Sequence, residues 1–153
     1  FGPDDTLNRA MFATVIYRLC EDHGDIGVQR FPDVVLGEYY DVPVRWAAEL
    51  EIVKGYPDGT FGPNNLITRE QMAVMLYRFV ESDDGVYEED LDKSKISTYS
   101  DYADVHDWAQ DAMAWAVNNK IITGKAGVSL DPLGYATRAE CAAILRRLRS
   151  MGG

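Results

Sequence analysis

The sequence predicts an all-α, mainly helical protein in which helix-loop-helix repeats form a bundle about a pseudo-threefold axis. Segment 61–79 aligns without gaps to segments 1–19 and 130–148. Each copy has apolar residues at i, i+3, i+4 and i+7, the spacing of an amphipathic helix that packs against its neighbours. The apolar stripes are Phe12, Val15, Ile16 and Leu19; Met72, Met75, Leu76 and Phe79; and Cys141, Ile144, Leu145 and Leu148.

Each of these three helices has a start signal. Asn8, Thr68 and Thr137 stand at the expected N-cap positions. Gln71 and Glu140 follow two of these caps at capping-box spacing, where their side chains can accept a hydrogen bond from the backbone N–H of the cap. We therefore expect helices to begin directly after the three caps.

Two of the copies also have an upstream half. It opens with Phe-Pro-Asp-Val at 31–34 in the middle copy and with Tyr-Ala-Asp-Val at 102–105 in the last copy, and each continues into a helical pattern around Trp46 or Trp115. Pro-Asp-Gly at 57–59 predicts a tight turn before the downstream helix. The repeat is therefore helix, turn-rich loop, helix.

These copies divide the chain into parts of one domain. Residues 1–20 form the downstream half of a first repeat, 31–80 a second repeat and 99–150 a third. Residues 81–98 lack periodicity and predict an exposed acidic linker. Because no upstream helix precedes Phe1, we expect residues outside this sequence, or a partner chain, to complete the first repeat. The acidic residues of the linker are Glu81, Asp83, Asp84, Glu88, Glu89, Asp90 and Asp92.

The composition favours a folded acidic protein and excludes several classes of partner. Hydrophobic residues make up 46% of the chain and the formal net charge is -10. Dispersed Lys and Arg in an acidic chain offer no basic face for nucleic acid. The apolar runs are too short for a membrane span, and no signal-peptide pattern opens the chain.

The cysteines and histidines predict no cofactor and no metal site. Cys20 and Cys141 make neither a disulfide framework nor a metal cluster, and His23 and His106 stand apart. We expect these side chains to be buried or incidental, and we expect no disulfide between the two cysteines.

The repeats resemble the S-layer homology (SLH) family. The middle copy carries the aromatic-x-Asp-Val opening at 31–34 and a tryptophan helix. It continues with Ile-Val-x-Gly-Tyr-Pro-Asp-Gly-Thr-Phe-x-Pro at 52–63 and Ile-Thr-Arg-Glu at 67–70. The third copy departs from the family at 124–130, where no Tyr-Pro-Asp-Gly loop stands.

The resemblance implies a non-catalytic module that holds a bacterial surface protein outside the cell, in the cell wall or the S-layer. Its three repeats would form a pseudo-trimer. The grooves between repeats would bind an anionic secondary cell-wall polysaccharide, linked to peptidoglycan and often bearing pyruvate ketals. The family's Thr-Arg-Ala-Glu motif falls on 137–140 and, in altered form, on 68–71. At 8–11 it reads Asn-Arg-Ala-Met, which keeps the arginine and loses the glutamate.

Three arginines, Arg9, Arg69 and Arg138, directly follow the N-caps. A cation at this end of the helix dipole costs about 0.3–1 kcal/mol, so the recurrence indicates a role beyond helix stability. We expect a ligand carboxylate between the guanidinium and the free first-turn N–H groups. The alternative is an ion pair with an acid of a neighbouring repeat, such as Asp33 or Asp104.

Tryptophans and loop residues complete the candidate site. Trp46 and Trp115 either stack on a sugar ring or fill space between repeats, and helix-spaced aromatics favour the second role. Gly59 is expected in the turn, and Asp33 and Asp104 as helix caps that orient groove residues. The predicted ligand-binding set is Arg9, Arg69, Arg138, Thr68, Thr137, Glu140, Trp46, Trp115, Asp33, Asp104 and Gly59.

Other functions have weaker support. An enzyme needs a nucleophile with a base, a metal cluster or converging carboxylates, and His23 and His106 lie in non-equivalent loops. The loop at 58–65 lacks the alternating ligands and closing Glu of a calcium-binding EF-hand. The main alternative is a helical protein-interaction or oligomerisation module, whose grooves receive a peptide instead of a glycan.

Overall fold

The computed structural model describes residues 5–84, 91–125 and 128–152, and within these ranges the regular structure is helical. The all-α prediction is therefore confirmed. Phe1 and three of the seven predicted linker acids, Glu88, Glu89 and Asp90, lie outside the described residues. The elements are α1 (Arg9–Leu19), α2 (Asp41–Glu49), α3 (Arg69–Asp84), η1 (Ile96–Thr98), η2 (Tyr102–Asp104), η3 (Asp107–Ala109), α4 (Gln110–Asn118) and α5 (Arg138–Gly152).

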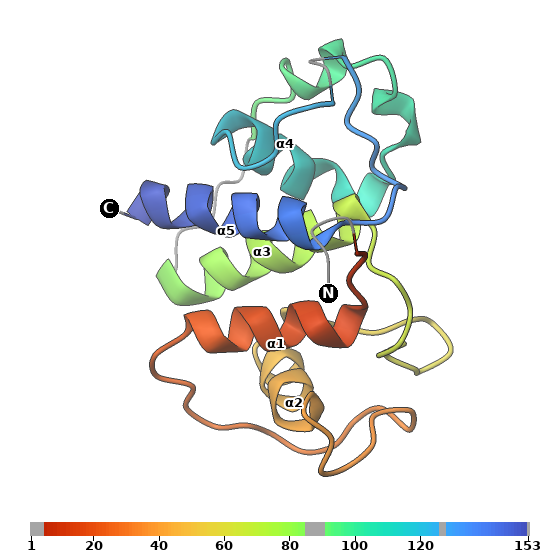
Figure 1. Cartoon of the computed structure of the whole chain (residues 1–153), viewed down its shortest axis with the longest axis vertical. Coiled ribbons are helices and arrows are strands. Elements are labelled where there is room, and N and C mark those ends of the chain that lie inside the picture. The colour runs from red at the N-terminus through yellow and green to blue at the C-terminus, as the bar shows by residue number, and fades with distance from the viewer. Residues whose placement is uncertain (1–4, 85–90, 126–127, 153) are drawn as a thin grey trace.

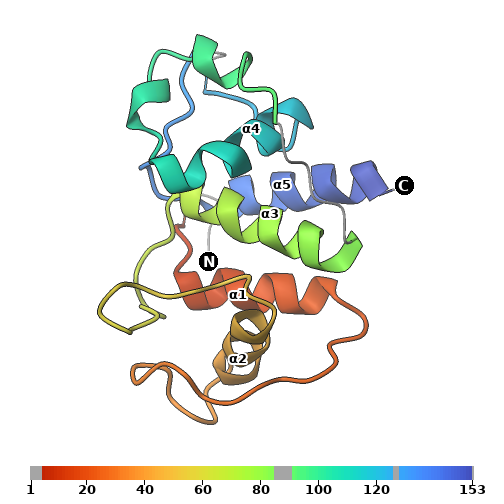
Figure 2. The same cartoon turned by 180° about the vertical axis from the view of Figure 1, so that it is seen from behind.

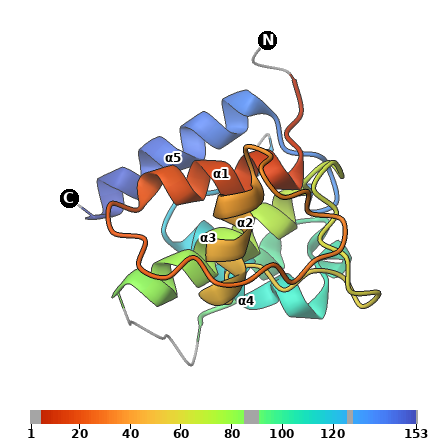
Figure 3. The ribbon, with the colours of Figure 1, turned by 90° about the horizontal axis from the view of Figure 1, so that it is seen from below.

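Three central helices, α1, α3 and α5, run in the same direction with their N-termini at one end (Figure 1). The order of the three differs between the front view and the view from below (Figure 3), so they form a triangular bundle instead of a layer. Helix α2 packs on α1 at one side and α4 packs on α3 at the other, as the rear view also shows (Figure 2). The predicted common axis is present.

The predicted caps start these helices. The Asn8 side chain accepts a backbone N–H of α1 at 2.7 Å. Thr68 and Gln71 bond reciprocally, at 3.2 and 3.0 Å, and Thr137 and Glu140 do so at 3.1 and 3.3 Å. Two complete capping boxes are therefore confirmed.

The apolar stripes form the core between the helices. Met75 and Ile144 are buried, as expected. Val15 is only partly buried, because Phe12 and Ile16 provide the fully buried contacts of α1. Burial of these side chains is the main stabilising contribution of the bundle.

Both helix tryptophans belong to this core. Trp46 is 0% exposed and meets Tyr17 edge-on with ring centroids 5.4 Å apart, while Trp115 is 4% exposed and lies 5.5 Å from Tyr77. These contacts attach α2 and α4 to the central helices. Their burial agrees with the space-filling role that the helix spacing favours, and a ligand role for either indole stays a prediction.

The linker prediction needs correction at both ends. Helix α3 continues to Asp84, so the first predicted linker residues are helical. At the other end Ile96, in η1, is fully buried and belongs to the core. The buried core of the third repeat therefore includes a residue that precedes 99, within the predicted linker.

The two cysteines provide a test of this packing. Cys20 and Cys141 are free thiols, and burial raises the pKa of the Cys141 thiol to about 11. We expect iodoacetamide at pH 8 to alkylate the half-buried Cys20 in the native protein and to leave Cys141 unmodified, as measured by mass spectrometry. Both should react in urea; rapid double alkylation of the native protein would contradict the buried position.

Candidate functional site: the inter-repeat grooves

A ring of backbone hydrogen bonds ties the starts of the three central helices together. Leu7, Ile67 and Ala136 occupy equivalent positions, each directly before an N-cap. The N–H of Leu7 donates to Ala136 O at 3.1 Å, that of Ala136 to Ile67 O at 3.0 Å, and that of Ile67 to Leu7 O at 2.9 Å. Each repeat donates to one neighbour and accepts from the other, so closure needs all three.

The first backbone N–H of each central helix is also paired across repeats. Its acceptor is a carbonyl of the segment that leads into a neighbouring helix. Because these amides already donate, the expectation that free first-turn N–H groups hold an anion is wrong for them. The pairs are Arg9 to Asn65 at 2.9 Å, Arg69 to Gly134 at 2.9 Å and Arg138 to Asp5 at 2.8 Å.

Two of the arginine side chains connect a helix start to the loop of the next repeat. Arg9 Nε donates to Phe61 O and Arg69 Nε donates to Leu130 O, both at 2.9 Å. The two arginines are only 7% and 5% exposed, and burial lowers the pKa of each guanidinium. An arginine stays charged nonetheless, so each brings a partly desolvated cation to the boundary between repeats.

An aspartate of each loop-bearing repeat anchors the same loop. Asp33 accepts the backbone N–H groups of Phe61 and Gly62 at 2.9 and 2.8 Å. Asp101 accepts two equivalent N–H groups in the third repeat, both at 2.8 Å. Asp104, predicted for this place, is exposed in η2, and neither α2 nor α4 has a side-chain cap. The helix-capping role predicted for Asp33 and Asp104 is therefore wrong.

The opening motif of the third repeat is therefore Tyr-Ser-Asp at 99–101, three residues before the predicted Tyr-Ala-Asp-Val at 102–105. The Phe31 ring packs on Gly55, where a Cβ would lie 2.6 Å from it, and the Tyr99 ring packs on Gly124 in the same way. Aromatic ring, glycine and loop-anchoring carboxylate thus match in both repeats.

The Arg9 groove is a cavity of about 380 Å³ between the start of α1, the loop of the middle repeat and α3. The Arg9 guanidinium lies 4.8 Å from the ring centroids of Tyr56 and Phe61, a distance at which a cation interacts with an aromatic face. The residues that line the groove are Arg9, Ile52, Val53, Lys54, Gly55, Tyr56, Pro57, Gln71, Val74, Met75, Arg78 and Trp108.

Trp108 gives this groove an exposed aromatic wall. The residue is 54% exposed and stacks on His106 with ring centroids 5.2 Å apart. The buried carboxylate of Glu70 accepts the His106 backbone N–H at 3.1 Å and contacts its ring Nδ1 at 2.5 Å. The third repeat thus presents an indole to a groove formed mainly by the first two.

The Arg69 groove has the same volume, about 380 Å³, and is formed by the equivalent parts of the next repeat pair. Here Arg69 forms an ion pair with Glu140, the alternative weighed for these arginines. The position of Glu140 is held by Gln71 in the Arg9 groove. Beside the guanidinium, the Arg69 groove therefore has a carboxylate where the Arg9 groove has an amide. The linings also differ in that Tyr56 and Trp108 belong to the Arg9 groove and Lys125 to the Arg69 groove.

A second recurring arginine was missed in the sequence analysis. Arg78 Nη1 donates to Ile52 O at 3.4 Å, and Arg147 Nη1 donates to Ile121 O at 3.1 Å. Both line a groove. The signal was available, because Arg18, Arg78 and Arg147 occupy the same column of the aligned segments.

The Arg9 groove holds positive charge without a bonded counter-charge. Within the described ranges, Arg9, Lys54 and Arg78 form no ion pair. Burial lowers the pKa of Arg78, and the nearby Glu81 and Glu51 act in the opposite direction. In a chain of net charge -10, this groove is a local cationic site beside an aromatic wall.

The third arginine has a different neighbour. Arg138 Nη2 donates to Met11 Sδ at 3.9 Å, and Met11 holds the position of Gln71 and Glu140. The aligned loop carbonyl, that of Phe1, lies outside the described residues. The described chain therefore defines two of the grooves that the resemblance implies.

The remaining predicted site residues have structural bonds. The Thr68 and Thr137 hydroxyls accept N–H groups as helix caps. Gly59 has φ of +88° in the turn, where Asp58 accepts both the N–H and the hydroxyl of Thr60. A ligand role for these residues stays a prediction.

The family model of the S-layer homology domain matches residues 30–73 and 98–142, together more than half of the chain. The chain therefore belongs to the S-layer homology family, whose domains anchor surface proteins to the cell wall. The protein is thus a module of the bacterial cell surface.

Relatives of this chain include enzymes and surface proteins. The chain is 33% identical over 154 residues to an amylopullulanase of Thermoanaerobacterium thermosulfurigenes, covering 100% of this chain and 8% of that protein. It is 29% identical over 150 residues to the surface-layer 125 kDa protein of Lysinibacillus sphaericus (96% and 12%), and 33% identical over 92 residues to a cellulosome-anchoring protein of Acetivibrio thermocellus (60% and 20%). The chain thus spans a small part of each relative.

Two further findings concern the described ranges alone. No helix there combines the length and the hydropathy that a bilayer span requires. No three His, Cys, Asp or Glu side chains converge there as ligands for a metal ion.

The loop anchors can be tested by substitution. Asp33→Ala and Asp101→Ala each remove a carboxylate that accepts two N–H bonds, so each should lower the free energy of unfolding by about 3 kcal/mol in urea titrations. Asp104→Ala is the matched control and should change it by less than about 0.5 kcal/mol. If Asp104→Ala lowered the free energy of unfolding more than Asp101→Ala, Asp104 and not Asp101 would be the equivalent of Asp33.

Proposed function

We propose that this chain anchors its parent protein to the bacterial wall by binding an anionic secondary wall polysaccharide, bearing pyruvate and linked to peptidoglycan, in the Arg9 groove. The observation that carries the proposal is the set of three cations, Arg9, Lys54 and Arg78, without an ion-pair partner in the described chain. Trp108 lies beside them.

The chemistry of this groove suits a carboxylate on a sugar. Arg9 uses Nε to hold the loop, and its two Nη groups remain for a ligand. A guanidinium binds a planar carboxylate through two parallel hydrogen bonds, and a charged hydrogen bond contributes about 1.5–3 kcal/mol. The exposed face of Trp108 can pack on the apolar face of a pyranose ring, as indoles commonly do with flat apolar surfaces.

The Arg69 groove is proposed to bind more weakly. Its guanidinium is already paired with Glu140, so an anionic ligand would have to displace a carboxylate held in place by a capping box. The charge that attracts the ligand is neutralised at the same time. The polysaccharide should therefore select the first groove.

Exchanging the two groove residues tests the proposal without removing an arginine. Gln71→Glu keeps the capping box, since Glu140 makes the same bond to its own cap. The new carboxylate should pair with Arg9 and weaken binding of purified wall polysaccharide by about 10- to 100-fold in calorimetry. Glu140→Gln is the matched change in the second groove; it should leave binding intact or strengthen it.

Two results would contradict the proposal. One is unchanged affinity in Gln71→Glu when its melting temperature matches that of the wild type. The other is equal binding of the polysaccharide before and after removal of its pyruvate, because the carboxylate is then not recognised. Binding to a protein partner that Gln71→Glu leaves untouched would instead favour the protein-interaction alternative.

A further inference from the structure

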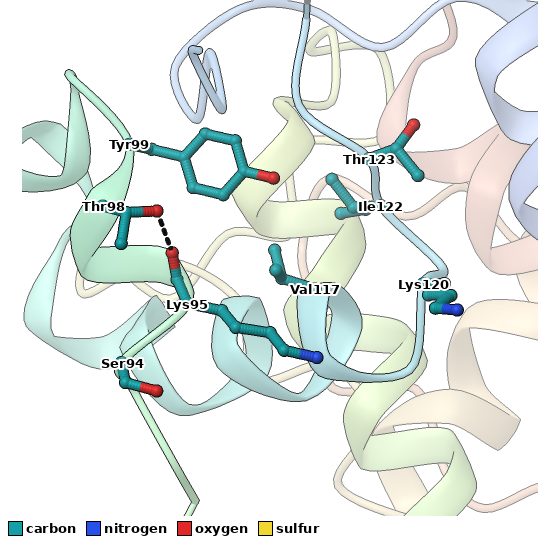
Figure 4. A pocket seen from close by; sticks show the side chains of 8 residues that line it. All are labelled: Ser94, Lys95, Thr98, Tyr99, Val117, Lys120, Ile122 and Thr123. Atoms are coloured by element: carbon teal, nitrogen blue, oxygen red, sulfur yellow. Dashed lines mark hydrogen bonds between the residues drawn. The ribbon is translucent and has the colours of Figure 1, made fainter. Parts of the chain in front are cut away.

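A pocket within the third repeat, here called the lysine pocket, lies between η1 and the turn that follows α4. It is a cavity of about 510 Å³ and borders the Arg69 groove, with which it shares Ile122 and Thr123. In Figure 4 the side chain of Lys95, the residue directly before η1, extends toward Val117, and Lys120 stands on the opposite side. Two ammonium groups therefore flank one cavity with an apolar wall.

The aligned place in the middle repeat holds an ion pair between Arg30 and Glu49. The Arg30 guanidinium donates to Ala48 O at 3.1 Å and to the Glu49 carboxylate at 2.6 Å. The aligned residues of the third repeat are Thr98 for Arg30 and Asn118 for Glu49. The third repeat thus lacks both the guanidinium and the carboxylate of this ion pair.

Lys120 also reverses a charge. It aligns with Glu51, and both residues have φ of 60°, so the backbone supports the alignment. Lys95 and Lys120 form no ion pair among the described residues. Asp92, which Lys95 influences electrostatically, accepts the backbone N–H of Ser94 at 2.9 Å. Both lysines are exposed, so their ammonium groups are accessible to a dissolved anion.

We propose that the lysine pocket binds a phosphoryl group carried on a sugar or polyol. A phosphate monoester carries a charge of about −1.5 to −2 at pH 7, which two ammonium groups can balance, and lysine binds phosphate oxygens as a point charge. The hydroxyl of Tyr99 supplies a further donor, and Val117 and Ile122 can contact the carbon atoms of the carrier. The cavity volume lies in the range of small-molecule sites, about 300–1,000 Å³.

Titration of the ¹⁵N-labelled chain with glycerol 3-phosphate tests this site. We expect saturable shifts of the Ile122 and Thr123 amide signals. The double variant Lys95→Gln/Lys120→Gln should weaken this binding by at least about tenfold. Lys93→Gln is the matched control, because Lys93 pairs with Asp111 and does not line the pocket.

Inorganic phosphate and glycerol at the same ionic strength separate the two sources of affinity. If phosphate binds more weakly than glycerol 3-phosphate and glycerol does not bind, the site recognises a phosphoryl group together with its carrier. Equal affinity for phosphate and glycerol 3-phosphate overturns the role of the carrier. Absence of saturable shifts, or binding unchanged in the folded double variant, overturns the site itself. The Gln71→Glu variant should still bind glycerol 3-phosphate, since this pocket is independent of the Arg9 groove.

Discussion

The ring of backbone hydrogen bonds among Leu7, Ile67 and Ala136 is the constraint on which the rest of the structure depends. Each bond joins two different repeats, so one repeat cannot form the ring, and the three central helices must start at a common point. An arginine placed directly after the N-cap then reaches the loop carbonyl of the next repeat, as Arg9 and Arg69 do. The hydrogen bonds that close the bundle therefore also form the walls of the grooves. A loop cannot move away from the helix start without breaking the bond to the arginine and opening the groove.

Within this symmetric frame, one side chain determines whether the groove arginine has a bonded counter-charge. Arg9 and Arg69 each donate through Nε to a loop carbonyl, and burial lowers the pKa of each guanidinium. Glu140 neutralises one of them, whereas the amide of Gln71 keeps the capping geometry and leaves the other guanidinium charged toward the groove. The capping bond uses only Oε1 of Gln71 or Glu140. The other terminal atom can therefore be an amide nitrogen or a carboxylate oxygen without a change in the scaffold.

The helices and caps were predictable because their signals are local, as the box of Thr68 and Gln71 illustrates. Asp101 was not, since Asp104 stands in a similar aromatic context and only the position of the loop amides distinguishes the two. Trp108 was missed for a related reason: whether an indole is covered depends on packing between repeats, and the tryptophans in matched helix positions proved to be the covered ones. The Gln71 and Glu140 difference was visible in sequence, but its effect on charge required the arginine to be placed beside it.

Arginine Nε–Hε signals, followed by NMR during titration with a pyruvylated wall-polysaccharide fragment, test the central claim most directly. That claim is that the interlocked repeats form two similar grooves and that charge selects one of them. The Arg9 signal should shift saturably while the Arg69 signal stays in place, because only the first guanidinium lacks a carboxylate partner in the described chain. Equal shifts of both signals, or a shift of Arg69 alone, would contradict the account.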